Sequence, residues 1–456
     1  MRLKISPGGG IGRRDGLKIR YSKGCGGSSP PPGTHMVNKS FVPIFILLTS
    51  LFSFLAYKPA DVVIAGPQMT DLEYFEEELQ IIEDTSSLKI KYVVYSDIES
   101  HLIENKDSNI DIAIIPNPQG VINLGEREIV KPIENVITEE KINIYYPTHL
   151  QEITSSKITD ENYGAFFRLF PNSLIWYSTE KFKEIGSPEF NSYNDILDYT
   201  KNYSKEGKNL WCLDIESGAS TGWIATNWLE DLILSEYGVE IYDKWSSQNL
   251  VSSSDEILDS INNIGKLVFI DNAVYGTNKR IVRKEFRNNF NNLLNKDVDC
   301  VFAWGGHYAS FYMPQDKKFG KDYDFFKFPT TINKSSMAGI GDVITVLNYS
   351  DATQEVFNAI IDESFGQNWM NKSDATYIPA NKLNQNFIAN PSTEKQANLI
   401  KQSLYENTFR YDASELMERK IGAGALWTAL TNYIDMGRER ANREIKDITE
   451  ELDSNF

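Results

Sequence analysis

Hydrophobic and polar positions in the N-terminal third of the chain alternate between two periods. Residues 61–67 are a β-branched apolar run typical of a buried strand, and residues 72–82 repeat apolar positions at helical spacing. Residues 88–95 and 110–115 again have the pattern of strands. Because strands that alternate with helices form sheets covered by helices, the pattern predicts an α/β fold with doubly wound sheets.

The rest of the chain continues in the same way. Residues 164–177 predict two strands separated by Pro171, and residues 254–269 predict a helix whose apolar stripe is Ile257, Ile261, Ile264 and Val268. Further helices are predicted at 194–203, 227–237, 353–365 and 426–434, with a solvated helix in the charged tail 438–456. Strands are predicted at 210–215, in the segment that ends at Trp304, and within 336–347 after a turn at 339–342.

Two predicted strands end in loops that carry amide side chains. Gln68 follows the first strand, and Asn117 and Gln119 follow the third. Because ligands of open parallel sheets bind beyond the carboxyl ends of the strands, these amides are candidate ligand contacts. An ordinary Pro/Gly turn explains the second loop almost as well.

The segment 211–238 combines indoles with acids. Trp211, Trp223 and Trp228 lie close in sequence to four acids, which are Asp214, Glu216, Glu230 and Asp231. An indole face beside hydrogen-bonding carboxylates suits a polyol, whose C–H groups stack on rings while its hydroxyls need acceptors. The alternative is that the indoles are core and the acids solvated. Helical spacing places Trp228 in the core, whereas Trp223, just after Gly222, is expected at a cleft.

Length, charge and the N-terminal segment limit the class of protein. The 456 residues suffice for two lobes. Residues 1–35, rich in Gly, Ser and Pro, are expected to be disordered or an upstream leader, and residues 36–60 resemble a secretory signal, although an uncleaved membrane tether is an alternative. After residue 60 there are 37 basic against 62 acidic residues. This acidic body argues against nucleic-acid binding and is compatible with a neutral ligand.

Cysteine and histidine usage gives two further predictions. Cys25 lies in the leader, which leaves Cys212 and Cys300, both on predicted strands; an oxidising periplasm would allow them to form a disulfide worth roughly 4 kcal/mol. No Cys follows the signal-like run, so a lipoprotein anchor is not expected. His307 is isolated from other metal-ligand types, so neither a metal nor a cofactor is predicted.

Several motifs occur in an order that resembles a known family. Residues 173–186, 209–234, 242–245 and 409–427 resemble the alpha-glucoside group of extracellular solute-binding proteins of ABC transporters, which is related to maltose-binding proteins. The resemblance implies a periplasmic binding protein-like α/β fold, with two lobes joined by a multi-strand hinge. It implies lobe 1 at 61–168 and 328–380, and lobe 2 at 169–327 and 381–456. It also implies a periplasmic location, ABC permease and ATPase subunits of the inner membrane as partners, a monomer and no enzymatic activity.

The resemblance also implies candidate site residues. Trp304, followed by Gly305 and His307, is similar to a ligand tryptophan of the maltose-binding relatives, and Asp342 ends a Gly-x-Gly-Asp turn whose acid faces the cleft in the family. A turn Asp that caps its own backbone is the alternative for Asp342. Trp427 corresponds to a stacking aromatic. The full predicted ligand set is Gln68, Asn117, Gln119, Glu216, Thr221, Trp223, Trp304, Gly305, His307, Asp342 and Trp427.

Three functions remain open from the sequence. The leading one is capture of a neutral sugar, an alpha-glucoside or oligosaccharide, by hinge closure with Trp223, Trp304 and Trp427 as stacking rings. The same fold could instead bind another small solute, such as a polyamine or a polyol. A glycosidase would need two of Asp214, Glu216, Glu230 and Asp231 placed across a glycosidic bond, and no hydrolase motif accompanies them.

Overall fold

The computed structural model describes residues 60–106 and 108–454. The predicted leader at 1–35 and nearly all of the predicted signal segment at 36–60 lie outside these residues. Among the described helices, none is long and apolar enough to cross a membrane.

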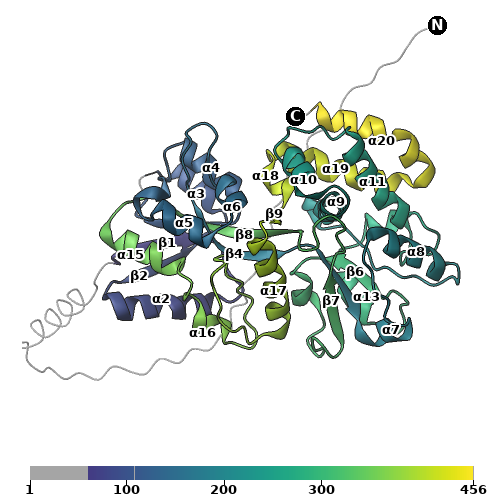
Figure 1. Cartoon of the computed structure of the whole chain (residues 1–456), viewed down its shortest axis with the longest axis horizontal. Coiled ribbons are helices and arrows are strands. Elements are labelled where there is room, and N and C mark those ends of the chain that lie inside the picture. The colour runs from purple at the N-terminus through teal and green to yellow at the C-terminus, as the bar shows by residue number, and fades with distance from the viewer. Residues whose placement is uncertain (1–59, 107, 455–456) are drawn as a thin grey trace, which may run out of the picture. The chain divides into compact units, whose positions relative to one another are not determined.

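Lobe 1 is built on a mixed sheet of order β2-β1-β3-β8-β4, with β9 paired to β8 (Figure 1). The strands β1, β2 and β3 are parallel, as the alternating pattern predicts, whereas β8 runs antiparallel to β3 and β4. In Figure 1, α2 and α16 lie on one side of this sheet and α3 to α6 on the other. The strands are β1 (Val62–Gly66), β2 (Ile90–Val94), β3 (Ile112–Ile115), β4 (Ala165–Pro171), β8 (Met337–Val346) and β9 (Phe409–Tyr411).

Five helices of lobe 1, α3, α4, α5, α15 and α17, begin with a side-chain cap. Asn117 and Asn390 cap α4 and α17 through their side-chain oxygens, and a proline follows each in the first turn. The helices are α2 (Leu72–Ser86), α3 (Ile98–Glu104), α4 (Pro118–Glu126), α5 (Glu139–Tyr145), α6 (Thr148–Glu152), α15 (Asp351–Ile360), α16 (Gln367–Met370) and α17 (Pro391–Tyr405), with a 3₁₀ turn at Ile133–Asn135.

Lobe 2 has a smaller sheet of order β6-β5-β7, in which both outer strands are antiparallel to β5. Its strands are β5 (Leu174–Ser178), β6 (Phe302–Gly305) and β7 (Tyr323–Lys327). Its helices are α7 (Thr179–Glu184), α8 (Tyr193–Ser204), α9 (Trp223–Glu236), α10 (Gly238–Ser246), α11 (Asp255–Val268), α12 (Asn278–Ile281), α13 (Asn288–Leu294), α14 (Ala309–Tyr312), α18 (Ala413–Leu416), α19 (Trp427–Met436) and α20 (Arg438–Asp453), with a 3₁₀ turn at Gly218–Ser220 and a π-helix at Lys420–Leu426.

Two hydrophobic cores, one in each lobe, meet where the chain crosses between them. The crossings lie between Leu169 and Leu174, between Phe328 and Met337, and at Asp412. Backbone hydrogen bonds tie the crossings together: the Asn172 amide donates to Ala338 O at 2.9 Å, and the Asp412 amide donates to Gly339 O at 2.8 Å. Three adjacent chain passages of this kind can act as a hinge.

Four expectations differ from the structure. Ile388, Ile400 and Leu404 pack into the core of lobe 1, although residues 381–411 were expected in lobe 2. Residues 210–215 form isolated bridges at Trp211 and not a regular strand. Residues 339–342 belong to β8 and do not form a turn. Finally, α20 is not solvated on all sides, because residues 441, 445 and 452 are buried in the core of lobe 2.

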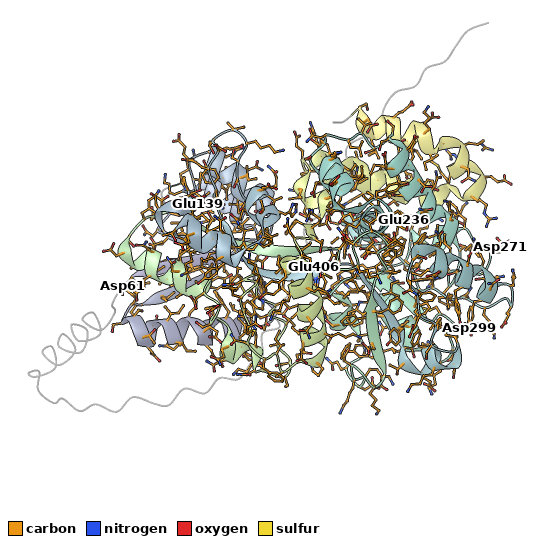
Figure 2. The ribbon with its side chains drawn as sticks, viewed as in Figure 1. Asp61, Glu139, Glu236, Asp271, Asp299 and Glu406 are labelled. Carbon is orange, nitrogen blue, oxygen red and sulfur yellow. A yellow bond between two sulfur atoms is a disulfide. The ribbon has the colours of Figure 1, made fainter. Side chains whose placement is uncertain are left out.

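Acidic side chains lie on the surface of both lobes. Glu139 and Asp61 lie on lobe 1, and Asp271 and Asp299 project from lobe 2 (Figure 2). Asp271 is 96% exposed in its ion pair with Arg438. Such a surface repels polyanions.

The predicted cysteine pair is joined in lobe 2. Cys212 and Cys300 form a disulfide with Cα atoms 5.6 Å apart, and both residues are buried in the core. The bridge fastens the segment before α9 to the segment before β6.

Candidate functional site

The structure assigns Trp304 to the core of lobe 2, which corrects its predicted role as a stacking ring for a ligand. Its ring is 2% exposed and lies between Phe328, with centroids 4.6 Å apart, and Trp228, with centroids 5.6 Å apart. Its indole N–H donates to Asp231 Oδ2 at 2.6 Å. Both faces and the polar edge of Trp304 are therefore occupied by the protein itself. Trp228 is core, as its helical spacing predicts.

Trp223 remains partly exposed at the start of α9 and begins a row of rings. It contacts Tyr308 edge to face, with centroids 5.1 Å apart, and Phe286 in the same way at 5.1 Å. Tyr308 contacts His307 at 5.8 Å, and His307 stacks on Phe170 at 4.5 Å. We call Trp223, Tyr308, His307 and Phe170 the aromatic row. It runs from α9 of lobe 2 to the first crossing.

The aromatic row ends at an ion pair of lobe 1. The Arg168 guanidinium lies 5.1 Å from the centre of the Phe170 ring, and its Nε donates to Asp342 Oδ2 at 2.5 Å. Both charged residues are nearly buried on neighbouring strands β4 and β8. The acid of the Gly-x-Gly-Asp motif is thus neutralised by Arg168, which the strand pairing supplies.

His307 is a neutral side chain in this setting. Burial, and secondarily the Arg168 charge, lowers the pKa of His307 to about 3. A neutral imidazole has one donor and one acceptor nitrogen. The adjacent Gly305 is buried under the Tyr308 ring, which leaves Gly305 little room to reach a ligand.

Trp427 lies beside the start of α9. A Cβ placed on Gly222, which has a φ of +117°, would overlap the Trp427 carbonyl, so only glycine permits this approach. Thr221 precedes Gly222 and donates its hydroxyl to Gly218 O at 2.7 Å. The two half-buried indoles of Trp223 and Trp427 are therefore brought to neighbouring backbone positions from distant parts of the sequence.

Glu216 belongs to the same region through its backbone. Its carbonyl accepts from the Phe286 amide at 2.9 Å, which holds Phe286 against Trp223. Its carboxylate accepts from the Gly218 amide. Glu216 is half-buried, whereas the other acids of the segment, Asp214, Glu230 and Asp231, are at most 1% exposed.

Asn117 is used by the structure as a helix cap. Its Oδ1 accepts from the Gly120 amide at 2.6 Å, and its Nδ2 donates to Glu99 Oε1 at 2.8 Å. Burial raises the pKa of Glu99. The loop lies near the hinge, because the Tyr411 hydroxyl is 3.1 Å from Pro116 O.

The other two predicted amides point to local partners. Gln68 is exposed after β1, and its Nε2 donates to Met69 O at 3.0 Å. Gln119 Nε2 donates to Asn123 Oδ1 at 3.1 Å within α4. Neither contact connects these side chains to the aromatic row.

Five cavities on the described residues lie away from the predicted ligand residues. One of about 290 Å³ is lined by residues 378–404, including Phe387 and Lys401. Four other cavities contain none of the predicted ligand residues; they lie at 106–131, 178–183, 181–208 and 268–278, together with neighbouring residues. The candidate site is therefore defined by ring contacts and hydrogen bonds.

A buried pair of acids at the third crossing was missed by the sequence analysis. Glu230 on α9 lies beside Asp412, and both are nearly inaccessible to water. Burial, and then the Asp412 charge, raises the pKa of Glu230 well above its ordinary range, and the pKa of Asp412 is raised as well. The Tyr242 hydroxyl lies 3.1 Å from Glu230 Oε2. The raised pKa favours the protonated carboxyl of Glu230, because two buried carboxylates side by side repel each other when both are ionised.

We expect Glu230→Gln to change the pH dependence of stability. The folded protein holds a proton on Glu230 that the unfolded chain releases above about pH 4.3. As the pH rises from about 4.3 toward the raised pKa of Glu230 in the folded protein, the free energy of unfolding of the wild type therefore falls relative to that of the variant. The fall is at most about 1.4 kcal/mol per pH unit. Urea unfolding of both proteins from pH 4 to 8 measures the difference. Parallel stability curves would show that Glu230 is ionised in the fold.

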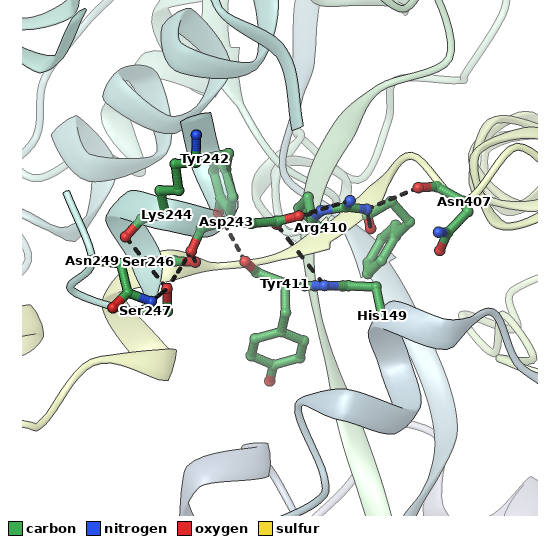
Figure 3. A network of polar contacts seen from close by, with 11 residues as sticks. His149, Tyr242, Asp243, Lys244, Ser246, Ser247, Asn249, Asn407, Arg410 and Tyr411 are labelled. Atoms are coloured by element: carbon green, nitrogen blue, oxygen red, sulfur yellow. Dashed lines mark hydrogen bonds and ion pairs between the residues drawn. The ribbon is translucent and has the colours of Figure 1, made fainter. Parts of the chain in front are cut away.

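A second polar network joins the lobes at β9. Arg410 donates from Nε and Nη2 to the two carboxylate oxygens of Asp243 on α10, at 2.6 and 3.0 Å (Figure 3). His149 on α6 of lobe 1 approaches the same carboxylate, with Nδ1 4.0 Å from Oδ1. Burial, and secondarily the Arg410 charge, lowers the pKa of His149, so this contact involves a neutral imidazole. The network connects α6, α10 and β9 across the third crossing.

Comparisons with known proteins agree with this architecture. No family model matches the chain. The chain is 24% identical over 388 residues to the alpha-glucosides-binding periplasmic protein AglE of Rhizobium meliloti. This alignment covers 83% of this chain and 84% of AglE. The chain is 21% identical over 366 residues to the osmoprotective compounds-binding protein GgtB of Synechocystis sp., at 79% and 85% coverage.

Solved structures match over nearly their whole length. The bacterial solute receptor AcbH superimposes with a TM-score of 0.71 at 12% identity, covering 87% of this chain and 98% of that one. Apo RafE from Streptococcus pneumoniae gives 0.67 at 12% identity, with the same coverage. The chain is therefore a relative of periplasmic binding proteins with the fold of the sugar-receptor solute-binding proteins of ABC transporters, as its sequence motifs predict.

Proposed function

We propose that this protein is the substrate-binding component of an ABC transporter and captures a neutral sugar, an alpha-glucoside or oligosaccharide. The lobes would close around the ligand by rotation at the three crossings. The observation that carries the proposal is the aromatic row, which extends from α9 of lobe 2 to the Arg168–Asp342 pair of lobe 1.

The chemistry of the aromatic row suits a sugar. The half-buried rings of Trp223, His307 and Phe170 offer apolar faces for C–H groups, and the neutral His307 can bond a hydroxyl without carrying charge. Thr221 and Glu216 lie on the loop that leads to Trp223 and would supply further polar contacts. Trp427 would complete the lobe 2 side.

Lobe 1 would contribute polar groups from strand ends. Asp342 would act together with Arg168, and Asn117 together with Glu99. Gln68 and Gln119 would need to exchange their local partners for ligand hydroxyls, and Gly305 would act by allowing the chain to turn below Tyr308. In this assignment Trp304 supports the site from the core and does not touch the sugar.

Binding without chemistry is favoured over hydrolysis. A glycosidase needs two accessible carboxyl groups on either side of a glycosidic bond. Of the four acids considered from the sequence, Asp214, Glu230 and Asp231 are buried, and the relatives AglE and GgtB are binding proteins.

Location and partners follow from the same proposal. The named relative AglE is periplasmic, and we propose that residues 36–60 direct export of this chain as a soluble, non-lipidated monomer. It would deliver sugar to permease and ATPase subunits in the inner membrane.

A polyol or related osmoprotectant is a second candidate ligand. The relative GgtB is an osmoprotective compounds-binding protein, and the combination of rings with Glu216 would also accept a polyol. Titration calorimetry of the purified protein with maltose, trehalose, nitrophenyl glucosides and polyols separates the candidates. Saturable binding heats with a sugar, without release of a product, support the proposal. Hydrolysis of a nitrophenyl glucoside contradicts it, and so does the absence of binding heats with every sugar.

We expect Trp223→Ala to weaken sugar binding by about 10- to 100-fold. The reason is the loss of an aromatic face whose burial is worth about 1.5–3 kcal/mol. Calorimetry measures the affinity, with Trp223→Phe retaining part of the effect because it keeps a ring. Phe387→Ala is the surface control, since Phe387 is 65% exposed and lies away from the aromatic row. Equal affinities for Trp223→Ala and wild type would remove Trp223 from the site.

A further inference from the structure

Trp427 has an unusual setting for a tryptophan of this chain. Its ring is half-buried, yet it is not among the side chains that pack against either described core. Its indole nitrogen is buried and has no hydrogen-bond acceptor among the described residues. A ring outside the apolar cores with an enclosed, unsatisfied donor is a structural cost that needs an explanation.

Five other indole N–H groups of the described residues donate a hydrogen bond to an acceptor within the protein. Trp304 donates to Asp231 at 2.6 Å, Trp369 to Asp71 at 2.7 Å and Trp211 to Thr200 at 3.0 Å. Trp176 and Trp228 donate to backbone carbonyls at 3.1 and 3.3 Å. Trp245 also lacks an acceptor, but it is 0% exposed within the core of lobe 2. Trp427 therefore combines an unsatisfied donor with a partly accessible ring.

The local backbone places this donor at the candidate site. Trp427 follows directly on the π-helix Lys420–Leu426, and π-helical turns are frequent at functional sites. Its backbone packs on Gly222, the residue before Trp223 of the aromatic row. Gly422 is packed as closely, because a Cβ there would overlap Ser414 O. Close packing at these two glycines thus places the backbone of Trp427 beside the start of α9.

We propose that the indole N–H of Trp427 donates a hydrogen bond to an oxygen of the bound sugar, so that Trp427 recognises the ligand through its edge and not only through its ring face. The proposal rests on the proposed function. A sugar oxygen, from a hydroxyl, a ring or a glycosidic bond, satisfies the donor, and a ligand that lacks an acceptor there leaves it unsatisfied.

The test is titration calorimetry of Trp427→Phe with maltose, or with trehalose if maltose does not bind the wild type. Phenylalanine keeps an aromatic face and removes the N–H, and we expect the affinity to fall about tenfold. Trp245→Phe removes the other buried indole N–H that lacks an acceptor among the described residues, and because Trp245 is 0% exposed in the core of lobe 2, this variant should bind like wild type. Because Trp427→Phe breaks no bond within the protein, its urea unfolding without sugar should match wild type.

A second measurement reports on the donor directly. In ¹⁵N-tryptophan spectra, the indole signal that disappears in Trp427→Phe identifies Trp427, and it should shift and become protected from exchange when sugar is added. Wild-type binding with an unchanged Trp427→Phe affinity and an unshifted signal overturns this inference alone. Failure of the wild type to bind any sugar overturns the proposed function.

Discussion

Trp304→Ala is expected to lower the free energy of unfolding by about 3–5 kcal/mol, the range for truncating a large buried aromatic side chain. The substitution leaves a cavity between Phe328 and Trp228, which are stacked on the two faces of Trp304. It also leaves Asp231 buried without its indole donor. Burial already raises the pKa of Asp231 to about 7, so this carboxyl is costly to leave ionised and unpaired. Urea denaturation at pH 7 measures the loss.

Trp304→Phe separates the two contributions. It keeps most of the packing and removes the donor to Asp231, so a loss of about 1–3 kcal/mol is expected. Because the variant stays folded, its sugar affinity can be measured, and it should remain close to that of wild type. A large loss of affinity in Trp304→Phe with little loss of stability would return Trp304 to the ligand site.

Removal of the Cys212–Cys300 bridge is the second large effect. The cysteines are 88 residues apart in sequence, and the loop-entropy model assigns closure of such a loop about 4–5 kcal/mol. The Cys212→Ala/Cys300→Ala double variant should therefore unfold at a markedly lower urea concentration than the oxidised protein. Alanine is the suitable replacement, because both positions are buried in an apolar core.

The oxidation state can be checked independently. Intact-mass analysis of unfolded protein, alkylated with and without prior reduction, counts the free thiols. Two alkylated cysteines after residue 60 in the unreduced sample would contradict the bridge. Equal stability of the double variant and the oxidised protein would show instead that the bridge forms without constraining the unfolded chain.

Much of the fold could be predicted from sequence because its signals are local. The β-branched run that became β1 and the apolar stripe on α11 each depend on spacing within a single segment. The break at Pro171 between β4 and β5 is likewise a property of a few consecutive residues. The motif order was also sufficient to indicate the family.

The candidate site was only partly predictable, because its decisive contacts join distant segments. Trp223 and Trp304 look alike in sequence, each next to a glycine, yet Phe328 and Trp228 cover Trp304 while Trp223 stays partly open. Asp342 looked like a free acid in a turn until β4 placed Arg168 beside it. The proximity of Glu230 to Asp412 likewise exists only because α18, which begins directly after Asp412, packs against α9 and α10.

The sequence by itself determined the α/β segments, the cysteine pair and the kinship to solute-binding proteins, since each of these follows from local pattern or motif order. The tertiary structure alone decided which tryptophan is enclosed and which carboxyl is neutralised. Burial and ion pairing are set by the side chains that neighbouring strands and helices bring together, and these neighbours are far apart along the chain.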